Sequence, residues 1–320
     1  MRGGMNVGIG LRKVEAACAL VCAAALACVV ALVALVALVA LVAGAAPARA
    51  ATPPDLGPWR FESHTVGFFT RSQGIATDPE LPGITLYSWQ LGLEWAGPSG
   101  HSFRNLVGIP LQLLFAGYLH IGDIDTHGAK AYVPYENSAK GTEKAYGAVD
   151  VASGRILGWS VHQLDPGEAY NNSWTAVSPD GQWLVSGEWE NITSFLVFRV
   201  ADVGKASIDV VSRIVLDAPL TLVQGCDFDG PLRLVCQDDT AERRLLQVDL
   251  DRALDGADVA ARTTVLGTTP VDLAIPWLAP MCKNHTEAEG VDVSADGSTL
   301  RFLTVDPCLL WSHEYRYSAG

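Results

Sequence analysis

The sequence predicts an all-β chain whose short strands form the blades of a β-propeller, and three observations predict it. One strand–turn–strand pattern recurs along the chain, its copies lie about fifty residues apart, and few segments have helical periodicity. The clearest copy is WTAVSPDGQWLVSGEWE, residues 174–190, in which alternating apolar residues flank a Pro-Asp-Gly turn. An isolated hairpin is only marginally stable in water, so this one is expected to belong to a larger sheet or repeat.

The repeated pattern begins with a polar residue, continues as a short strand and ends in a tight turn. Its copies start at residues 73, 120, 173, 224 and 289, so the successive gaps are 47, 53, 51 and 65 residues. Apolar second strands are predicted after several copies, at 129–136, 182–190, 231–238 and 298–306. Third strands are predicted to begin at 146, 194 and 245. We therefore expect about five four-stranded blades, or six or seven if a further blade lies in the longest gap.

The strand that completes the ring is predicted near the start of the mature chain. The segment PWRFESHTVGFF, from Pro58, has the composition of a strand and has no hairpin partner of its own. We expect it to pair with the C-terminal segment.

The first fifty residues are expected to form a secretory signal peptide. Arg2, Arg12 and Lys13 precede an apolar run over 16–46, and residues 48–50 read Ala-Arg-Ala, a small-x-small cleavage site. The run is long enough to span a bilayer, so an uncleaved signal anchor is the alternative. In both cases residues 51–320 are expected to form a single β-propeller domain outside the cytoplasm, either secreted or anchored to the membrane.

The charge of residues 51–320 limits the partners of this domain. They carry 18 basic and 34 acidic residues, a net charge of −16. Such a surface repels nucleic acid and anionic lipid. We expect no nucleic-acid partner, and a membrane attachment only through an uncleaved leader.

Four cysteines remain after the predicted leader, which suits an oxidising compartment. Cys226 and Cys236 are equidistant from Pro231 in a turn, and are therefore expected to face each other on paired strands. Cys282 and Cys308 are equidistant from the turn of VDVSADGSTLRFL. We predict the disulfides Cys226–Cys236 and Cys282–Cys308; a four-cysteine zinc site is the alternative, although no C-x-x-C pair occurs.

The hairpins TAVSPDGQWLVSGEWE and VDVSADGSTLRFLT resemble the inner hairpins of the broad superfamily of WD-like, NHL-like and gluconolactonase-like propellers. QGIATDPE, HIGDIDTHGAKAYVP and QGCDFDG are also similar to segments of exported propeller proteins, and the likeness covers most of residues 64–315. No blade ends in the Trp-Asp pair of WD repeats, and the tryptophan-docking motif of quinoprotein propellers is absent. The resemblance therefore implies the fold much more firmly than an activity.

The polar residues that open the repeats are the candidate ligand-binding site. In a propeller the innermost strand of each blade lines the central channel, so the residue that opens this strand lies near one mouth. We expect a ring of polar side chains there, which would bind a small molecule: Gln73, His120, Asn172, Ser173, Gln224 and Glu289. The alternative is that these residues are polar only because the channel is wet.

A sharper hypothesis places a metal ion at this mouth. Glu289, His120 and Asp123 are the candidate ligands, and such an oxygen-rich set with one imidazole suits calcium or another divalent cation. Resemblance to gluconolactonase-like propellers implies a divalent ion, held by mouth Glu, Asn and Asp side chains, that polarises an ester or lactone carbonyl. Glu289 and Asn172 would be the counterparts of those ligands.

The functional hypothesis is an exported propeller that binds a small ligand or divalent cation at its channel mouth. One alternative is a metal-dependent lactonase or esterase, with Glu289 as a metal ligand and His120 as a ligand or general base. Another is a non-catalytic scaffold that binds an extracellular protein. No G-x-S-x-G, H-E-x-x-H or P-loop motif occurs, so the sequence assigns no catalytic residue and leaves open whether the protein is an enzyme.

Overall fold

In the computed structural model, the hairpin that is clearest in the sequence forms an antiparallel pair of strands. Strand β11 (Trp174–Val177) pairs with β12 (Trp183–Gly187), and Gly181 in the turn has a φ of 69°. This left-handed conformation is strained for residues with a Cβ atom, so the glycine fixes where the chain reverses. Every residue of both strands is buried, which places the hairpin inside the domain.

The structure describes residues 52–98, 100, 102–137, 141–169, 171–274, 281–282 and 285–320. The chain divides into two units, residues 1–50 and residues 51–320. The predicted leader lies outside the described residues. Within the described ranges, no helix is both long and apolar enough to cross a bilayer.

The described strands form four sheets, and in three of them the strands run in order from the innermost outward. The first contains β2 (Gly74–Thr77), β3 (Thr85–Trp89), β4 (Gly92–Ala96) and β5 (Ser102–Asn105). The second contains β6 (His120–Ile121) and β7 (Asp125–His127), then β8 (Lys130–Glu136), β9 (Glu143–Asp150) and β10 (Ile156–Gln163). The third contains β19 (Glu287–Val293), β20 (Thr299–Val305), β21 (Trp311–Ala319) and β1 (Trp59–Phe68).

The fourth sheet has eight strands and consists of two four-stranded halves. One half contains β11, β12, β13 (Ile192–Arg199) and β14 (Ser212–Leu220). The other half contains β15 (Val223–Phe228), β16 (Arg233–Asp238), β17 (Arg244–Leu250) and β18 (Val259–Thr268). The outer strands β14 and β18 join the halves by parallel pairing over three residues, from Ile214 opposite Val259 to Leu216 opposite Ala261.

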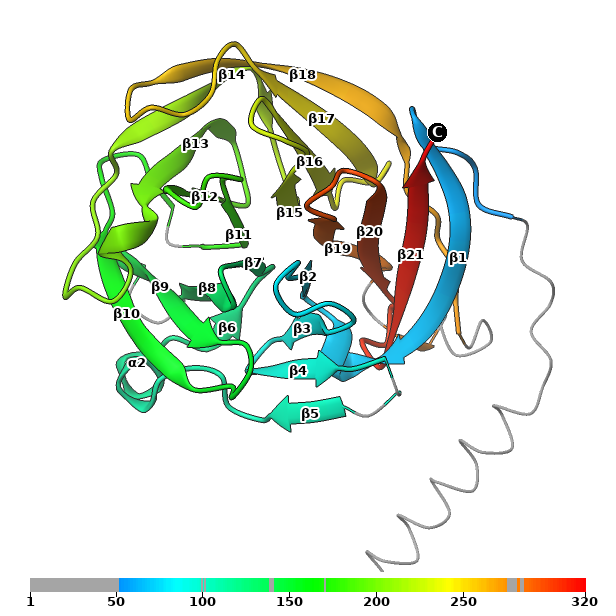
Figure 1. Cartoon of the computed structure of the whole chain (residues 1–320), viewed down its shortest axis with the longest axis horizontal. Helices are drawn as coiled ribbons and strands as arrows, with labels where there is room; N and C mark the ends of the chain where they lie inside the picture. Colours follow the sequence, from blue (N-terminus) through cyan, green and yellow to red (C-terminus); the bar gives the residue numbers. More distant parts are fainter. Residues whose placement is uncertain are drawn as a thin grey trace, which may run out of the picture. The chain divides into compact units, whose positions relative to one another are not determined.

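These groups of strands are arranged radially, as Figure 1 shows. Strands β2, β7, β11, β15 and β19 surround the centre, and β5, β10, β14, β18 and β1 lie at the periphery. This arrangement is that of a β-propeller, as the repeat spacing predicts.

The ring closes through an early strand and a late one. Strand β1 pairs antiparallel with β21, from Trp59 opposite Ala319 to Phe68 opposite Trp311. The expectation that the segment from Pro58 pairs with the C-terminal segment is therefore confirmed. This pairing covers the outer edge of β21 and leaves β1 as the peripheral strand of its sheet.

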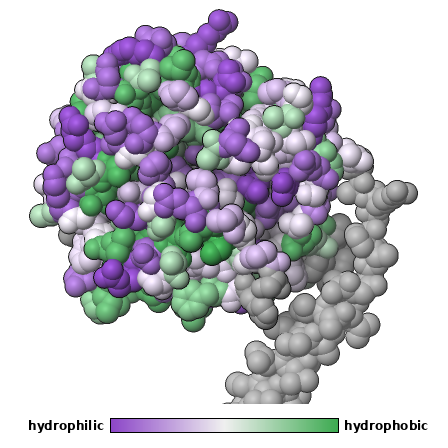
Figure 2. Space-filling model, in the orientation of Figure 1, coloured by the Kyte–Doolittle hydropathy of each residue, from purple (hydrophilic) through white to green (hydrophobic). Residues whose placement is uncertain are grey.

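The hydrophobic core lies between neighbouring sheets. Its largest cluster joins the two halves of the eight-stranded sheet, and Trp174 packs edge-on against Phe195 with ring centroids 4.9 Å apart. The only α-helix of the described chain, α2 (Leu111–Ala116), belongs to the connection from β5 to β6. Figure 2 shows that the face in view is mostly hydrophilic, with hydrophobic surface gathered at the lower left edge, where Figure 1 places α2.

Both predicted disulfides are confirmed. Cys226 and Cys236 are opposite one another on β15 and β16, with Cα atoms 4.0 Å apart. Cys282 and Cys308 have Cα atoms 5.2 Å apart, and they tie the chain before β19 to the turn between β20 and β21. Paired cysteines are typical of proteins that fold in an oxidising environment.

Candidate functional site

The predicted mouth residues lie at the same end of the innermost strands. Gln73 precedes β2, His120 opens β6, Asn172 and Ser173 precede β11, and Gln224 and Glu289 lie in the first half of β15 and β19. Propeller geometry therefore brings together residues that are more than two hundred positions apart in the chain. The side chains of these residues nevertheless have different surroundings.

Three of the side chains form a continuous link across three sheets. Nε2 of His120 lies 2.7 Å from Oε1 of Gln73, and Nε2 of Gln73 donates a longer hydrogen bond of 3.4 Å to Oε1 of Glu289. Because the Gln73 oxygen can only accept, His120 must carry its proton on Nε2. Gln73 thus connects an imidazole and a carboxyl group that the sequence places 169 positions apart.

The remaining nitrogen of His120 is an acceptor without a partner. Nδ1 is buried, lies 3.6 Å from Oε2 of Glu136, and has no hydrogen-bond partner among the described residues. Burial lowers the pKa of His120 to about 4. The ring is therefore neutral at pH 7, and its free lone pair could accept a hydrogen bond from a ligand or a proton from a reacting group.

Carboxyl groups gather beside this link. Glu289 is only 2% exposed, and burial, followed by the negative charges of Glu287 and Asp239, raises its pKa well above the usual value. The pKa values of Glu287 and Asp239 are also raised, chiefly by burial. Nε2 of His285 lies 2.9 Å from Oδ2 of Asp239, whose Oδ1 accepts the N–H of Ala288. We call the six residues that make up this arrangement the mouth cluster: Gln73, His120, Asp239, His285, Glu287 and Glu289.

Within the mouth cluster, the alternation of His285, Glu287 and Glu289 is visible in the sequence, whereas Asp239 was not singled out. Glu287 and Glu289 alternate along β19, and the two side chains interact because a strand directs residues i and i+2 to the same face. Asp239 follows β16 directly, and nothing in its sequence context distinguishes it from an ordinary turn residue. A neutral carboxylic acid next to a carboxylate can donate and accept hydrogen bonds at one place.

Asn172 and Ser173 lie below the surface of the mouth. Asn172 is fully buried, its Nδ2 donates to the carbonyl of Ala145 at 3.0 Å, and its Oδ1 accepts from Oγ of Ser186 at 2.8 Å. The carbonyl of Ser173 accepts the N–H of Asp123 at 2.8 Å. Both residues thus join neighbouring blades. Gln224 is half-buried on β15, and its role as a ligand-binding residue stays a prediction.

Asp123 lies at the centre of the ring of inner strands. Its Oδ1 accepts the N–H groups of Ile75 at 3.2 Å and Ile124 at 2.9 Å, and its Oδ2 accepts that of Val291 at 3.0 Å. A Cβ atom added at Gly74 would lie 2.8 Å from Oδ1 of Asp123, and Gly290 is equally constrained by this carboxyl group. Glycines therefore allow the inner strands to converge on one buried carboxyl group.

This placement bears on the predicted metal ligands Glu289, His120 and Asp123. Both oxygens of Asp123 are used by backbone donors, and Nε2 of His120 is used by Gln73. Over the described ranges, no group of three or more His, Cys, Asp or Glu side chains is arranged to hold a metal ion. The three residues thus do not form one coordination shell, and cation binding at the mouth stays a prediction.

Three further buried aspartates connect neighbouring blades toward the other end of the inner strands. Asp125 accepts the N–H of Val177 at 2.5 Å, Asp227 that of Val293 at 2.6 Å, and Asp292 that of Thr77 at 2.7 Å. We call Asp125, Asp227 and Asp292 the inter-blade carboxylates. Their recurrence shortly after glycine in GDID, GCDF and GVDV is a sequence signal that could have revealed them.

Acidification is expected to stabilise the fold between pH 7.5 and pH 5. Burial raises the pKa of Asp125 to about 7 and raises those of Asp227 and Asp292 as well. An aspartate in the unfolded chain has a pKa of about 3.9, so the folded state binds more protons between these values and gains stability as the pH falls. Each group that takes up a proton contributes up to about 1.4 kcal/mol per pH unit. His120 and His64, whose pKa values burial lowers, oppose this trend, but the carboxyl groups with raised pKa values outnumber them.

Thermal unfolding followed by circular dichroism at pH 7.5, 6 and 5 measures this effect. The midpoint should rise at each step. A midpoint that falls steadily over this interval would show that the inter-blade carboxylates remain ionised in the folded protein.

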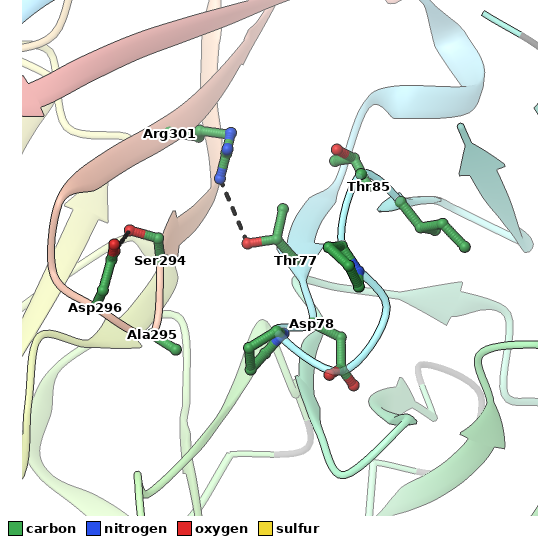
Figure 3. Close-up of a pocket in the computed structure, with 11 residues that line it drawn as sticks. Thr77, Asp78, Thr85, Ser294, Ala295, Asp296 and Arg301 are labelled. Atoms are coloured by element: carbon green, nitrogen blue, oxygen red, sulfur yellow. Dashed lines mark hydrogen bonds between the residues drawn. The ribbon is translucent and has the colours of Figure 1, made fainter. Parts of the chain in front are cut away.

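A cavity that the sequence did not indicate lies at the opposite ends of β2 and β19. It has a volume of about 520 Å³ and lies between the β2–β3 connection and the β19–β20 turn. Arg301 extends toward Thr77 across this cavity (Figure 3), donating to Oγ1 of Thr77 at 3.4 Å and to Oδ2 of Asp292 at 2.6 Å. The Arg301 guanidinium is therefore already paired with protein groups, and the mouth cluster is the better candidate for ligand binding.

Comparisons with known proteins do not identify a family for this chain. No family model and no curated protein sequence matches it. Among solved structures, it is similar to a gluconolactonase from Xanthomonas campestris, with 13% identity and a TM-score of 0.39 over 85% of this chain and 99% of that one. A DUF4623 family protein from Bacteroides eggerthii matches with 12% identity and a TM-score of 0.41 over 83% of this chain and 77% of that one.

A third match is the Swd1 β-propeller domain from Myceliophteria thermophila. It has 14% identity and a TM-score of 0.29, over 55% of this chain and 48% of that one. At these identities and TM-scores, the activity of none of these proteins can be assigned to this chain.

Proposed function

We propose that this protein is an exported five-bladed propeller that binds a small polar ligand through its mouth cluster. The observation that carries the proposal is the link from His120 through Gln73 to Glu289, which brings a neutral imidazole, an amide and a buried carboxyl group to one end of the channel. Nδ1 of His120, a buried acceptor with no hydrogen-bond partner in the described part of the chain, adjoins this link. Groups of this kind that converge at the mouth of a ring of strands are typical of ligand sites.

The sheet pairings support a count of five blades. Three sheets would supply one blade each, and the eight-stranded sheet would supply two, because its halves meet only through the short parallel contact of β14 with β18. The five groups correspond to the five repeats in the sequence. In this count the fifth blade is formed by β19, β20, β21 and β1.

The chemistry of the mouth cluster favours a ligand rich in hydroxyl groups. A neutral Glu289 can donate a hydrogen bond, ionised carboxylates beside it can accept, and Gln73 offers both functions. Hydrogen bonds are stronger in a buried site than in water. A ligand that fails to pair with these groups would leave them buried and unsatisfied, so the site discriminates against it. Sugars, polyols and their lactones present this mixture of donors and acceptors.

A divalent cation is the second candidate ligand. Glu287 and Glu289 would supply two of its oxygen donors after losing their protons, as calcium requires. Binding of calcium at pH 7 would then release protons from Glu289, since burial and like charges keep its pKa high in the absence of a cation.

The alternative of a lactonase or esterase is favoured by one specific observation. His120 is neutral and its Nδ1 is free, so it could act as a general base while the carboxyl group of Glu289 acts as an acid. The two groups are joined by Gln73, which would hold them at a fixed separation. Turnover of lactones or esters distinguishes this possibility from binding alone.

Glu289→Gln is expected to weaken ligand binding about tenfold or more, because a buried hydrogen bond to a charged or acidic group is worth about 1.5–3 kcal/mol. Full-chain protein secreted from its own leader and purified without chelator is first assayed for bound metal by inductively coupled plasma mass spectrometry. Calcium, then a panel of sugars, polyols and lactones, is titrated by calorimetry in two buffers of different ionisation enthalpy, and the lactones are assayed for hydrolysis.

The matched control is Glu80→Gln, which alters an exposed glutamate away from the mouth cluster. It should bind as the parent protein does. If no probe binds the parent, or if Glu289→Gln and Glu80→Gln bind equally well, the mouth cluster is only the wet lining of the channel. Hydrolysis that disappears in His120→Ala would establish the enzymatic alternative.

Export is supported by the two disulfides and by the leader predicted over residues 1–50. The ligand would then be one that is met outside the cytoplasm.

A further inference from the structure

The hydrophobic core of the described chain divides into five clusters, one at each boundary between neighbouring blades. Four of these clusters contain between 8 and 21 buried side chains each. The cluster between the blade of β2–β5 and the blade of β19, β20, β21 and β1 contains three in the described residues: Ile75, Tyr87 and Leu303. We call this boundary the polar seam. Because burial of apolar area is the main favourable term in packing, the polar seam gains the least from it.

Hydrogen bonds to carboxylates hold the polar seam together instead. The N–H and Oγ1 of Thr77 donate to Oδ1 of Asp292 at 2.7 and 2.9 Å. The hydroxyl of Tyr87 donates to Oε2 of Glu314 at 2.6 Å. Arg301 adds the longer hydrogen bond to Thr77, at 3.4 Å. If the blades separate, both partners of each of these bonds can pair with water, so the net loss is small for each bond.

The charged groups beside the polar seam have their counter-ions within their own blade. Nη1 of Arg301 lies 2.6 Å from Oδ2 of Asp292, and its Nε lies 3.9 Å from Oε1 of Glu314; all three residues belong to β19, β20 and β21. In the opposite blade, Nε of Arg104 on β5 lies 2.8 Å from Oε2 of Glu94 on β4. Separation of the blades would therefore keep these ion pairs intact and would avoid the cost of leaving a charge unpaired.

The polar seam is also incompletely filled. The cavity of about 520 Å³ lies in it, with Thr77 and Thr85 on one side and Ser294 and Arg301 on the other (Figure 3). By comparison, a cavity at the boundary between the blades of β11 and β15 has a volume of about 60 Å³. Side chains that line an empty space lack van der Waals partners on one side, which weakens the packing of the two blades further.

The mouth cluster spans the polar seam. Gln73 precedes β2 and Glu289 lies on β19, and their hydrogen bond of 3.4 Å is the longer one in the link to His120. The inner edge of the seam is held by Asp123, which accepts the N–H groups of Ile75 from one blade and Val291 from the other. The seam is thus closed in this structure, and its opening would separate Gln73 from Glu289.

We propose that the ring opens transiently at the polar seam before it opens at any other boundary between blades, and that this opening interrupts the mouth cluster. Opening there exposes the least apolar area and breaks hydrogen bonds that water replaces. Regions that combine few buried apolar contacts with local polar bonds are those that open at a free energy below that of global unfolding. The complete mouth cluster is therefore a property of the closed ring only.

Hydrogen exchange at three equivalent backbone amides tests the proposal. The N–H groups of Thr77, Val177 and Val293 each donate to an inter-blade carboxylate across a blade boundary, at 2.7, 2.5 and 2.6 Å. Thr77 reports on the polar seam, and the other two report on boundaries that bury eight and ten apolar side chains. In the full-chain protein, exchange is followed by NMR and corrected for intrinsic rates. The protection of Thr77 should be at least about tenfold lower than that of Val177 and Val293.

Tyr87→Phe should increase the exchange rate at Thr77 by a further factor of about ten, because it removes a hydrogen bond to a charged group across the seam. Exchange at Val177 and Val293 should stay unchanged. The matched control is Tyr315→Phe, which removes a hydroxyl bonded to Asp272 at 2.9 Å and belongs to the cluster at the opposite side of the same blade. This control should leave exchange at Thr77 unchanged.

Three outcomes would overturn the proposal. Equal protection at the three amides would show that the boundaries open together, in global unfolding. Equal acceleration at all three in Tyr87→Phe would show that this hydroxyl stabilises the whole ring and not one seam. Loss of protection between β3 and β4 at the rate of Thr77 would show that the blade of β2–β5 unfolds as a unit. The experiment contains no ligand, so its failure leaves the proposed ligand binding by the mouth cluster to its own test.

Discussion

Replacing Asp123 by alanine is expected to lower the free energy of unfolding by about 4 kcal/mol, and replacement by asparagine by about half as much. The carboxyl group of Asp123 accepts N–H groups from Ile75, Ile124 and Val291, which lie on three different blades or their connections. Alanine leaves all three buried donors unsatisfied, each at a cost of about 1–3 kcal/mol without full additivity. Asparagine keeps one acceptor oxygen and directs an NH₂ group at the remaining donor.

Urea unfolding measured with and without chelator distinguishes this structural role from the predicted metal-binding role. If Asp123 only accepts backbone hydrogen bonds, its replacement lowers the free energy of unfolding by the same amount with and without chelator. If Asp123 is a cation ligand, its replacement lowers the free energy of unfolding only when the cation is present. The matched control is Asp209→Asn, an exposed aspartate, which should change the free energy of unfolding by less than about 0.5 kcal/mol.

Replacing Gly122 by alanine is expected to cost about 3 kcal/mol, near the upper end for overpacking. An added Cβ atom would contact the carbonyl group of Ser173, whose carbon would lie 2.6 Å away, and the carbonyl oxygen of Asn172 at 3.1 Å. These are backbone atoms, so the clash can be relieved only if the inner strands of two neighbouring blades separate. Their separation would also lengthen the hydrogen bond between the N–H of Asp123 and the carbonyl of Ser173.

Gly267→Ala provides the comparison for Gly122→Ala. The Cβ atom there would meet Cδ2 of Leu56 at 2.7 Å, but the nearest backbone atom is 3.9 Å away, so a change of rotamer relieves the contact. Differential scanning calorimetry should show a much larger fall in the unfolding temperature for Gly122→Ala than for Gly267→Ala. Similar falls in both variants would mean that the inner strands can move apart at little cost.

The repeat architecture could be predicted because it depends on features that are local in the sequence. Turn residues, alternating strands and a spacing of about fifty residues are each visible in the sequence, and together they predict the ring. The two disulfides followed from the symmetry of cysteines about a turn. The closing strand followed from a strand-like segment without a hairpin partner.

The candidate site could be predicted only in part, because side-chain direction depends on β-bulges. Register shifts occur between Ala288 and Val291 in β19 and between Val223 and Gly225 in β15. A shift of one residue moves a side chain to the other face of a strand, so the repeat alone could not show which residues face the mouth. Asn172 was expected at the mouth surface, and it is buried between blades instead, where its amide bonds the carbonyl of Ala145 and the hydroxyl of Ser186.

The contact of Asp239 with the rest of the mouth cluster could not be predicted, for a different reason. Asp239 meets His285 and Glu287 only because β16 and β19 are neighbours in the ring, and this proximity depends on the complete tertiary structure. The same holds for the inter-blade carboxylates, whose acceptors and donors belong to different repeats. Sequence patterns define each blade more readily than the contacts between blades.

The pairing of β1 with β21 also determines when the protein can first fold during its synthesis. Strand β1 emerges early, but its partner residues 311–319 are translated only after the intervening blades. Until then the ring has two open strand edges and its sheets lack one neighbour, so the nascent chain has no closed native state to reach. The ring can therefore close only after residues 311–319 have been synthesised, and any earlier folding is limited to the blades whose strands are already complete.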